Sequence, residues 1–186
     1  MILKNIVLLL SRFYRSIGCF HWKMQLRFLD FGEIGDNVIL NRGNFLFPQN
    51  IFIGDDVYLG PDAFLSSFGS LTFESGVITG PKLSVYTANH RFENARAIPY
   101  DDELIVQPVT IGANSWVGGG VTLLPGVVLG EGCVVGAGSV VTKTFPAGSV
   151  IAGNPARLIK TRNMTQYYRL KGENRIYLRL KANGTL

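Results

Sequence analysis

The sequence predicts a mainly β protein: a parallel β-helix of about five coils with three flat faces, an N-terminal helix, one long loop and a basic C-terminal segment. Three observations predict it: an aliphatic residue at every sixth position, an excess of glycine, and one long interruption of the period. Glycine makes up 22 of 186 residues, above the usual share of about 7%. The length suggests one domain with short appendages, and 47% hydrophobic residues exclude a wholly disordered chain.

The six-residue period is clearest in the second half of the chain. Its aliphatic positions are Ile111, Val117, Leu123, Leu129, Val135 and Val141. A period of six fits neither the 3.6 of a helix nor the alternation of a simple strand. It does fit a prism with one hexapeptide on each of three faces and the aliphatic side chain pointing inward. Glycine often follows the aliphatic residue, and we expect glycine or asparagine at corners where φ needs to be positive.

The inward positions group in threes, and each group forms one coil. The groups are 34/40/46, 53/59/65, 73/79/85, 111/117/123 and 129/135/141. Chance does not place so many hexapeptides in register. We therefore expect about five coils, stacked at a strand spacing of roughly 4.8 Å.

One segment interrupts the period. The step from Val85 to Ile111 is far longer than six, so a loop over residues 88–108 leaves the prism and returns. The loop contains Pro99 and the acidic run 101–103. A long excursion from a regular scaffold is usually functional.

The first 31 residues predict a basic amphipathic helix. Lys4, Arg12, Arg15, Lys23 and Arg27 share one side of it, and the apolar residues share the other. Charges interrupt the apolar run well short of the ~20 residues that a membrane span needs, and no signal-peptide cleavage site follows. The helix either packs on the body or a neighbouring subunit, or contacts an anionic membrane surface.

The net charge of +5 is unevenly distributed. It is +4 over residues 1–30, −6 over residues 31–156 and +7 over residues 157–186. Because the body is acidic and carries no recognised nucleic-acid module, we expect no nucleic-acid partner. The two cysteines, Cys19 and Cys133, form neither a disulfide framework nor a structural zinc site.

Four motifs accompany the ladder: Tyr-Thr-Ala-Asn-His at 86–90, Ser-Trp-Val-Gly-Gly-Gly at 115–120, Gly-Ala-Gly-Ser-Val-Val-Thr-Lys at 136–143, and Gly-Asn-Pro-Ala-Arg at 153–157. Together they resemble the hexapeptide-repeat acetyltransferases, in the branch of maltose, galactoside, nodulation-factor, xenobiotic and surface-polysaccharide sugar acetyltransferases. The resemblance covers about residues 32–162. It implies a left-handed β-helix, against the usual right-handed crossover. It also implies acetyl-CoA as donor and a homotrimer with active sites between neighbouring prisms.

His90 is the expected general base. Moving an acetyl group from a thioester to an alcohol or amine needs a base near the attacking group, and imidazole titrates near neutrality. His90 stands where the loop leaves the prism, whereas the only other histidine, His21, lies beside Trp22 in the predicted helix and receives a structural role. Cys133 occupies a small inward or corner position, so we expect direct attack by the acceptor rather than a covalent cysteine intermediate.

The resemblance assigns the reactive end of the donor site to three residues. Trp116 would border the pantetheine channel near the thioester, unless it simply caps a corner. Gly118 and Gly119 match a stretch whose backbone lines that arm, since glycine lets a ligand approach the main chain closely.

Five further residues continue the donor site by the same resemblance. Ala137, Thr142 and Lys143 match contacts further along the arm. Arg157 and Lys160 would face the nucleotide phosphates, where positive charge is wanted, unless they are simply solvated.

The acceptor side departs from the better-known sugar members of the family. They carry an acidic residue on the coil before the histidine, and this chain has Ser66 and Ser67 there. A hydroxyl binds a sugar hydroxyl but cannot accept two charge-assisted bonds as a carboxylate can. Further candidates for acceptor contacts or for orienting His90 are Asn89, Glu93, Asp101, Asp102 and Glu103.

The implied function is an acetyl-CoA-dependent O-acetyltransferase acting on a sugar of a bacterial surface polysaccharide or a related glycan. Alternatives are an amino-sugar N-acetyltransferase, an antibiotic (xenobiotic) acetyltransferase, and a non-catalytic β-helix binding protein. A hexapeptide carbonic anhydrase is excluded because it needs three histidine ligands, so no metal is expected. We expect domains at 1–31, 32–156 and 157–186 and a cytoplasmic protein, peripheral at the inner face of the membrane if the helix binds lipid.

Overall fold

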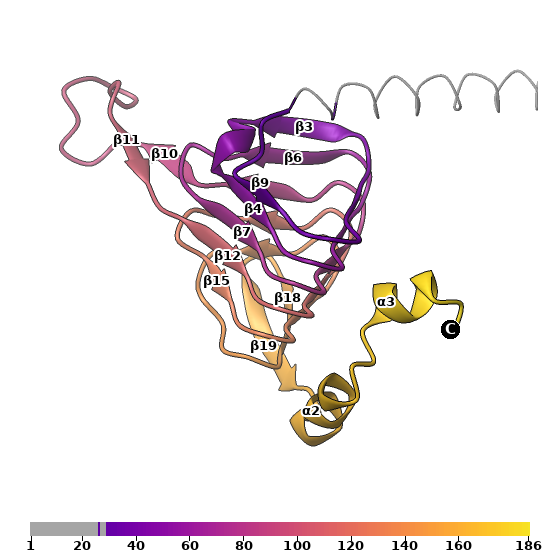
Figure 1. Cartoon of the computed structure of the whole chain (residues 1–186). Coiled ribbons are helices and arrows are strands. Elements are labelled where there is room, and N and C mark those ends of the chain that lie inside the picture. The colour runs from indigo at the N-terminus through magenta and orange to yellow at the C-terminus, as the bar shows by residue number, and fades with distance from the viewer. Residues whose placement is uncertain (1–25, 27–28) are drawn as a thin grey trace, which may run out of the picture. The chain divides into compact units, whose positions relative to one another are not determined.

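The computed structural model of the protein describes residue 26 and residues 29–186. The chain divides into two compact units, residues 1–30 and residues 31–186. The expected N-terminal amphipathic helix, with His21 and Cys19, lies outside the described residues. All the elements below belong to the second unit, which is a solenoid with an arm and a C-terminal extension (Figure 1).

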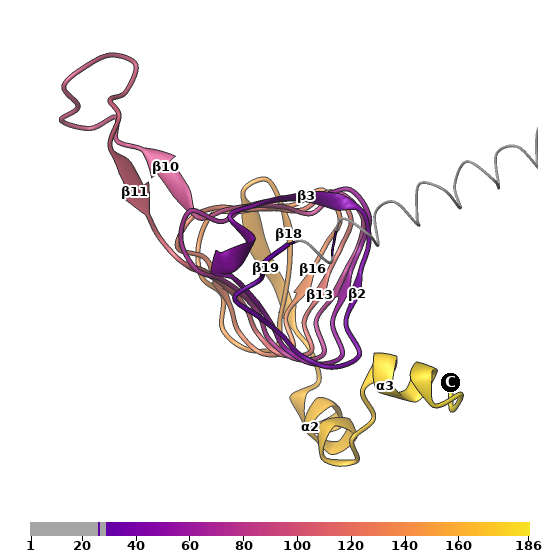
Figure 2. The same cartoon turned by 45° about the horizontal axis from the view of Figure 1, so that its top comes forward.

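Three parallel sheets form the faces of the solenoid (Figure 2). Face A contains β1 (Glu33–Ile34), β4 (Ile51–Ile53), β7 (Leu71–Phe73), β12 (Val109–Ile111) and β15 (Val128–Leu129). Face B contains β2 (Ile39–Leu40), β5 (Tyr58–Leu59), β8 (Ile78–Thr79), β13 (Trp116–Val117), β16 (Val134–Val135) and β18 (Ser149–Gly153). Face C contains β3 (Gly43–Leu46), β6 (Ala63–Ser66), β9 (Ser84–Tyr86), β14 (Thr122–Leu123) and β17 (Val140–Val141). A short 3₁₀ helix, η1 (Pro48–Asn50), joins the first two coils.

The predicted inward ladder forms the core from the second coil onward. Each of its residues from Ile53 to Val141 is at most 3% exposed. Equivalent residues of adjacent coils pair in register, as Val117 does with Val135. The small residues four positions after the ladder, such as Ser115 and Cys133, are also buried. The parallel β-helix prediction is therefore confirmed.

The structure corrects two details of the ladder. In the first coil, Phe45 rather than Leu46 pairs with Leu65 and is buried, while Leu46 is 38% exposed. Because side chains alternate between the two sides of a strand, a slip of one residue exchanges inside and outside. At the other end, Phe145 forms a β-bridge with Leu129, and β18 pairs with β16. These contacts add a sixth, incomplete coil to the five that the sequence predicts.

The corners also differ from expectation. The glycine after each aliphatic residue has no positive φ; instead it lets adjacent coils approach, and a Cβ on Gly118 would lie 2.6 Å from the amide nitrogen of Ala137. The left-handed residues stand later in the repeat. At the corner that precedes face B, residues with positive φ recur in successive coils. They include Gly76 (φ 78°), Asn114 (φ 54°) and Gly132 (φ 69°), and glycine and asparagine tolerate positive φ.

The long excursion is an ordered hairpin. Its strands β10 (Ala88–His90) and β11 (Leu104–Val106) pair antiparallel and project from the corner between faces C and A (Figures 1 and 2). We call residues 88–106 the hairpin arm. At its base the buried Thr87 hydroxyl donates to the carbonyl of Ser66 (3.1 Å) and accepts from the amide of Gly69 (2.8 Å). The amide of Gln107 donates to the carbonyl of Thr87 (2.8 Å), which closes the base of the arm.

The basic C-terminal segment is structured. Strand β19 (Ala156–Thr161) pairs antiparallel with β18, and helices α2 (Met164–Gly172) and α3 (Tyr177–Ala182) follow. Helix α2 begins at Asn163, whose side chain accepts from the amide of Gln166 (3.0 Å), as an N-cap does. We call residues 162–183 the C-terminal strap.

The C-terminal strap contacts several coils on the side of face B. Arg162 donates to the carbonyl of Gly132 (3.0 Å), which belongs to the fifth coil. The hydroxyl of Tyr167 donates to Glu131 (2.7 Å) and accepts from Asn114 (3.1 Å), a residue of the fourth coil. At its far end Arg179 pairs with Asp56 of the second coil (2.5 Å).

Within the described residues, none of the helices combines the length and apolar character needed to cross a membrane.

Candidate active site

His90 stands at the end of β10, opposite Leu104 of β11, and its side chain is exposed. Its ring stacks on Tyr100, with ring centroids 4.0 Å apart and planes 18° apart. Among the described residues, no hydrogen bond or ion pair involves the imidazole, so both ring nitrogens remain available to a substrate. A cavity of about 550 Å³ opens beside the ring and is lined by His90, Arg96, Ala97, Tyr100, Asp101 and Asp102.

A buried carboxylate fixes the loop that carries Tyr100. The Asp101 side chain is 4% exposed and pairs with the Arg91 guanidinium at 2.5 Å. It also accepts from the amides of Arg96 (3.0 Å) and Glu103 (3.1 Å). Hydrogen bonding to Arg91 holds the pKa of Asp101 well below its usual range. The same bond raises the pKa of Arg91.

The other acidic residues of the loop are placed less centrally. Glu103 pairs with Arg91 (2.7 Å), and Asp102 pairs with Arg96 (2.7 Å). Glu93 is exposed. None of these carboxylates forms a hydrogen bond or ion pair with His90 within the described residues, and a role in acceptor binding or in orienting the imidazole stays a prediction.

The predicted acceptor contacts lie apart from the imidazole. Asn89 precedes His90 in β10, so its side chain points to the opposite face of the strand. Ser66 and Ser67 are 8% and 0% exposed at the base of the hairpin arm. Among the described residues the Ser67 hydroxyl has no hydrogen-bond partner. A direct role of these three residues in acceptor binding stays a prediction.

The reactive end of the predicted donor site lies on face B and the corner that follows it. Trp116 is 58% exposed between its strand neighbours Ile78 and Val134. Gly118 and Gly119 occupy the corner between faces B and C, where the amide of Gly138 donates to the carbonyl of Gly119 (2.9 Å).

Further residues of the donor site continue along the same corner. Ala137 stacks on Gly118, and a Cβ on Gly136 would lie 2.9 Å from the Cβ of Ala152. Ala152 pairs with Arg157 of β19. The structure thus brings Trp116, the two glycines, Ala137 and Arg157 along one edge. Lys160 lies further along β19, opposite Val150, and is exposed.

Thr142 and Lys143 are on a different edge. They follow β17 at the corner between faces C and A and are exposed, with the Lys143 ammonium 5.6 Å from the ring centroid of Phe145. The hairpin arm with His90 leaves the same corner, two coils earlier. Within one chain, the predicted site residues therefore lie on two edges of the prism, which are separated by the width of face C.

Cys133 has the environment of a structural thiol. It is fully buried, and its sulfur donates to the carbonyl of Pro146 (3.3 Å). Burial raises the pKa of the Cys133 thiol, which disfavours the thiolate that a nucleophile needs. In the part of the chain that the structure describes, no group of three His, Cys, Asp or Glu side chains could hold a metal ion.

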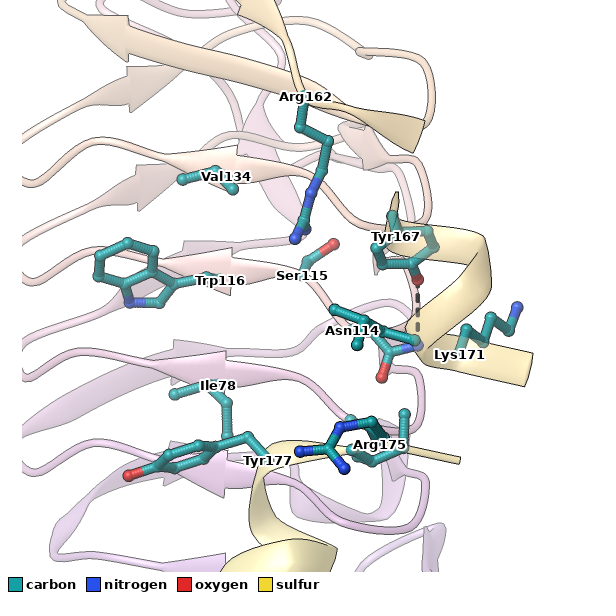
Figure 3. Close-up of a pocket in the computed structure, with 13 residues that line it drawn as sticks. Ile78, Asn114, Ser115, Trp116, Val134, Arg162, Tyr167, Lys171, Arg175 and Tyr177 are labelled. Atoms are coloured by element: carbon teal, nitrogen blue, oxygen red, sulfur yellow. Dashed lines mark hydrogen bonds between the residues drawn. The ribbon is translucent and has the colours of Figure 1, made fainter. Parts of the chain in front are cut away.

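Two features of the molecule were not predicted from the sequence. The first is Tyr100 beneath the imidazole; its position in the same loop as His90 was the available clue. The second is a pocket of about 550 Å³ between face B and the C-terminal strap, whose lining includes Trp116, Arg162, Arg175 and Tyr177 (Figure 3). We call it the strap pocket. The pocket is created by tertiary packing of the C-terminal strap, so no local sequence pattern predicts it.

Comparison with known proteins identifies relatives of similar sequence. The family model described as "Bacterial transferase hexapeptide (six repeats)" matches residues 108–143. A putative acetyltransferase of Saccharomyces cerevisiae is 35% identical over 130 residues, and the match covers 69% of this chain and 65% of that protein. Nodulation protein L of Rhizobium meliloti is 34% identical over 158 residues, covering 80% and 81%. The putative colanic acid biosynthesis acetyltransferase WcaF of Escherichia coli is 30% identical, covering 79% of each.

Solved structures agree with these relatives. A hexapeptide-repeat acetyltransferase from Vibrio cholerae, complexed with acetyl coenzyme A, matches with a TM-score of 0.67 and 28% identity, covering 72% of this chain and 73% of that chain. A maltose O-acetyltransferase from Clostridium difficile matches with a TM-score of 0.65 and 34% identity, covering 74% and 73%. These matches, together with the extent of the match to nodulation protein L, show that the chain belongs to the hexapeptide-repeat acetyltransferase family and that its prism is the left-handed β-helix of that family.

Proposed function

We propose that the chain transfers an acetyl group from acetyl-CoA to a hydroxyl of a sugar, in a surface polysaccharide or a related glycan, with His90 as general base. The main support is the exposed His90 imidazole. It stacks on Tyr100 with ring centroids 4.0 Å apart and lies beside a cavity of about 550 Å³. The maltose O-acetyltransferase and the colanic acid acetyltransferase among its relatives support a sugar acceptor. The acetyl coenzyme A complex of the Vibrio cholerae structure supports the donor.

The chemistry needs one group that both takes and returns a proton. An acceptor hydroxyl in the cavity gives its proton to a ring nitrogen of His90 while its oxygen attacks the thioester carbonyl. The tetrahedral adduct then collapses: the carbon–sulfur bond breaks, and the leaving thiolate takes the proton from the imidazolium. The acetyl ester and CoA thiol are the products, and no covalent enzyme intermediate forms, in keeping with the buried thiol of Cys133.

The donor would lie along the corner that follows face B. Trp116 would border the thioester end, the backbone of Gly118 and Gly119 would line the pantetheine arm, and Ala137 would extend that lining. Their alignment along one edge of the prism supports this assignment. Further along, the exposed basic side chains of Arg157 and Lys160 would face the nucleotide phosphates.

A homotrimer would join the two halves of the site. His90, Thr142 and Lys143 lie at the corner between faces C and A, away from the other predicted donor residues of the same chain. If the hairpin arm of one copy lies against the face B edge of the next, the two sets meet. The hairpin arm carries exposed apolar side chains that such a contact would bury; these are Phe92 (67% exposed), Ile98 (96%), Ile105 (45%) and Val106 (47%).

The decisive test measures thiol release from acetyl-CoA with a panel of neutral sugars, amino sugars and aminoglycoside antibiotics. We expect sugar-dependent turnover that falls by about 10²- to 10⁴-fold in His90→Ala. His21→Ala removes the only other histidine of the chain and serves as the control.

Two outcomes would contradict the proposal at different levels. Equal sugar-dependent turnover in wild type and His90→Ala would show that His90 is not the base. Failure of the protein to bind or be stabilised by CoA would remove the enzymatic proposal as a whole. Turnover on amino sugars or aminoglycosides alone would replace the sugar hydroxyl by an amine as acceptor.

A further inference from the structure

The strap pocket lies on the opposite side of face B from the proposed donor corner. It includes Asn114 and Ser115, which precede β13, whereas Gly118 and Gly119 follow that strand. Trp116 is the one residue that borders both. The strap pocket therefore extends away from the proposed donor corner, with Trp116 between the two, and the proposed transfer reaction assigns it no task.

Aromatic and aliphatic side chains line much of the strap pocket. Trp116 and Tyr177 are 58% and 54% exposed, and Ile78 and Val134, the strand neighbours of Trp116 on face B, also line the pocket. In Figure 3 both aromatic rings lie on the same side of the pocket. Half-exposed aromatic rings over an apolar floor offer flat surfaces on which the apolar face of a small ring can stack.

Two guanidinium groups line the same pocket and have no carboxylate partner among the described residues. Arg162 donates to the Gly132 carbonyl (3.0 Å) and lies 4.8 Å from the ring centroid of Tyr167, which fixes its direction. The Arg175 side chain has no hydrogen-bond or ion-pair partner among the described residues. Lys171, by contrast, pairs with Glu131 (2.5 Å). In Figure 3, Arg162 and Arg175 approach the middle of the pocket from opposite ends.

We propose that the strap pocket binds a ring that carries an anionic group: a sugar or nucleoside ring bearing a phosphate or carboxylate. The ring would stack on Trp116 and Tyr177, and the anion would bind the guanidinium groups of Arg162 and Arg175, whose planar geometry matches carboxylate and phosphate oxygens. A volume of about 550 Å³ is in the range of small-molecule sites. That a sugar is among the candidate rings rests on the proposed function.

The test is calorimetric titration of the full chain with glucose 1-phosphate, glucuronate and uridine monophosphate, and with glucose and uridine as neutral counterparts. We expect at least one anionic ring to bind and its neutral counterpart to bind at least about tenfold more weakly, since a charge-assisted hydrogen bond is lost. Sugar anions and the nucleotide compete for the same contacts, so their relative affinities identify the source of the ring.

Matched variants locate the binding. Arg175→Gln and Tyr177→Leu should each weaken it by about tenfold. Arg169→Gln and Tyr168→Leu remove the same groups from exposed positions of α2 that do not line the pocket, and should leave the affinity unchanged.

Three results would overturn the proposal: no binding by any anion of the panel, unchanged affinity in both pocket variants, or displacement of the anion by saturating acetyl-CoA. The last would make the pocket part of the donor site. Binding retained in His90→Ala supports the proposal whatever the turnover of that variant. The failure of this inference and the failure of the proposed reaction are therefore distinguishable.

Discussion

The His90 ring rests on one neighbour, and that contact defines its orientation. Tyr100 stacks at 4.0 Å beneath the imidazole, and the next residue, Asp101, is buried and bound to Arg91. The ring of Tyr100 is therefore held from one side by the loop, and it limits the tilt of the imidazole on the other. Positioning of this kind affects catalysis because proton transfer requires hydrogen-bond geometry.

Tyr100→Ala should lower kcat by about tenfold or more, because a misplaced catalytic group costs up to about 10². Tyr100→Phe keeps the stacked ring and should restore most of kcat, since the hydroxyl of Tyr100 forms no hydrogen bond among the described residues. Steady-state kinetics with acetyl-CoA and the most active acceptor of the sugar panel provide the measurement. A Phe variant as impaired as the Ala variant would assign the effect to the hydroxyl instead of the stack.

Sequence predicted individual residues well where the period was unbroken. Leu65 and Val117 are buried because the repeat leaves one inward position per hexapeptide. Phe45 and Leu46 are adjacent and both apolar, so the pattern alone could not decide which points inward. Tyr100 was missed because its partner lies across a hairpin, and such a contact leaves no periodic trace. The region of His90 was found through its place at the break of the period.

At the scale of elements, the C-terminal strap is tied to the solenoid by an ion pair with one buried member. Asp56 is 5% exposed and pairs with Arg179 of α3 (2.5 Å). Its carboxylate also accepts from Asn37 (2.7 Å). An ion pair with one shielded member contributes more than an exposed one because removal of a partner leaves a desolvated charge.

Arg179→Ala should lower the free energy of unfolding by about 1–3 kcal/mol. Arg42→Ala breaks a pair with Asp62 in which both side chains are exposed (74% and 49%) and should cost about 0–1 kcal/mol. Urea unfolding followed by tryptophan fluorescence measures both. Equal losses in the two variants would show that the buried position of Asp56 makes no difference.

The hairpin arm should respond to acid. The pKa of Asp101 is lowered from its ordinary value of 3.8, so the folded arm favours the carboxylate and the open arm binds a proton more readily. The resulting stability is present above about pH 4 and is lost as the pH falls through the folded pKa. Protection of the Arg96 and Glu103 amides, which donate to Asp101, should therefore decrease on acidification.

Amide hydrogen exchange, expressed as protection factors, measures this change. Asp101→Asn removes the titrating group and should abolish the pH dependence in the arm, while amides of the solenoid core keep their protection. A wild-type protection factor that stays constant from pH 5 to pH 2 would contradict the assignment.

The sequence predicted those elements whose signal is a local pattern of residues. The solenoid follows from its period, and the excursion follows from the interruption. The strands of the hairpin arm were not predicted because their pairing lacks the ladder pattern. The helices of the C-terminal strap were treated only as a basic segment; their positions depend on contacts such as Tyr167 with Glu131, remote in sequence.

At the scale of the whole molecule, assembly should depend on the tip of the hairpin arm. Ile98 is 96% exposed there, and placing a charge in a buried subunit contact is costly. If the proposed homotrimer forms through the arm, Ile98→Asp should convert a trimer of the 20.4 kDa chain to monomers and abolish turnover. Leu186→Asp changes another exposed apolar residue, at the C-terminus, and serves as control.

Size-exclusion chromatography with light scattering gives the mass of each variant. A wild-type monomer that turns over acetyl-CoA and sugar at full rate would contradict the shared site. A trimer that survives Ile98→Asp with unchanged activity would place the contact between copies elsewhere.

The C-terminal strap also changes how the solenoid can come apart. In a simple stack each coil touches only its neighbours, so the ends can fray while the middle stays folded. Here one segment is bonded to Asp56 in the second coil, Asn114 in the fourth and Gly132 in the fifth. Opening any of these coils means releasing the segment that binds the others. The strap thereby couples coils that are not adjacent, and we expect these coils to unfold together rather than layer by layer.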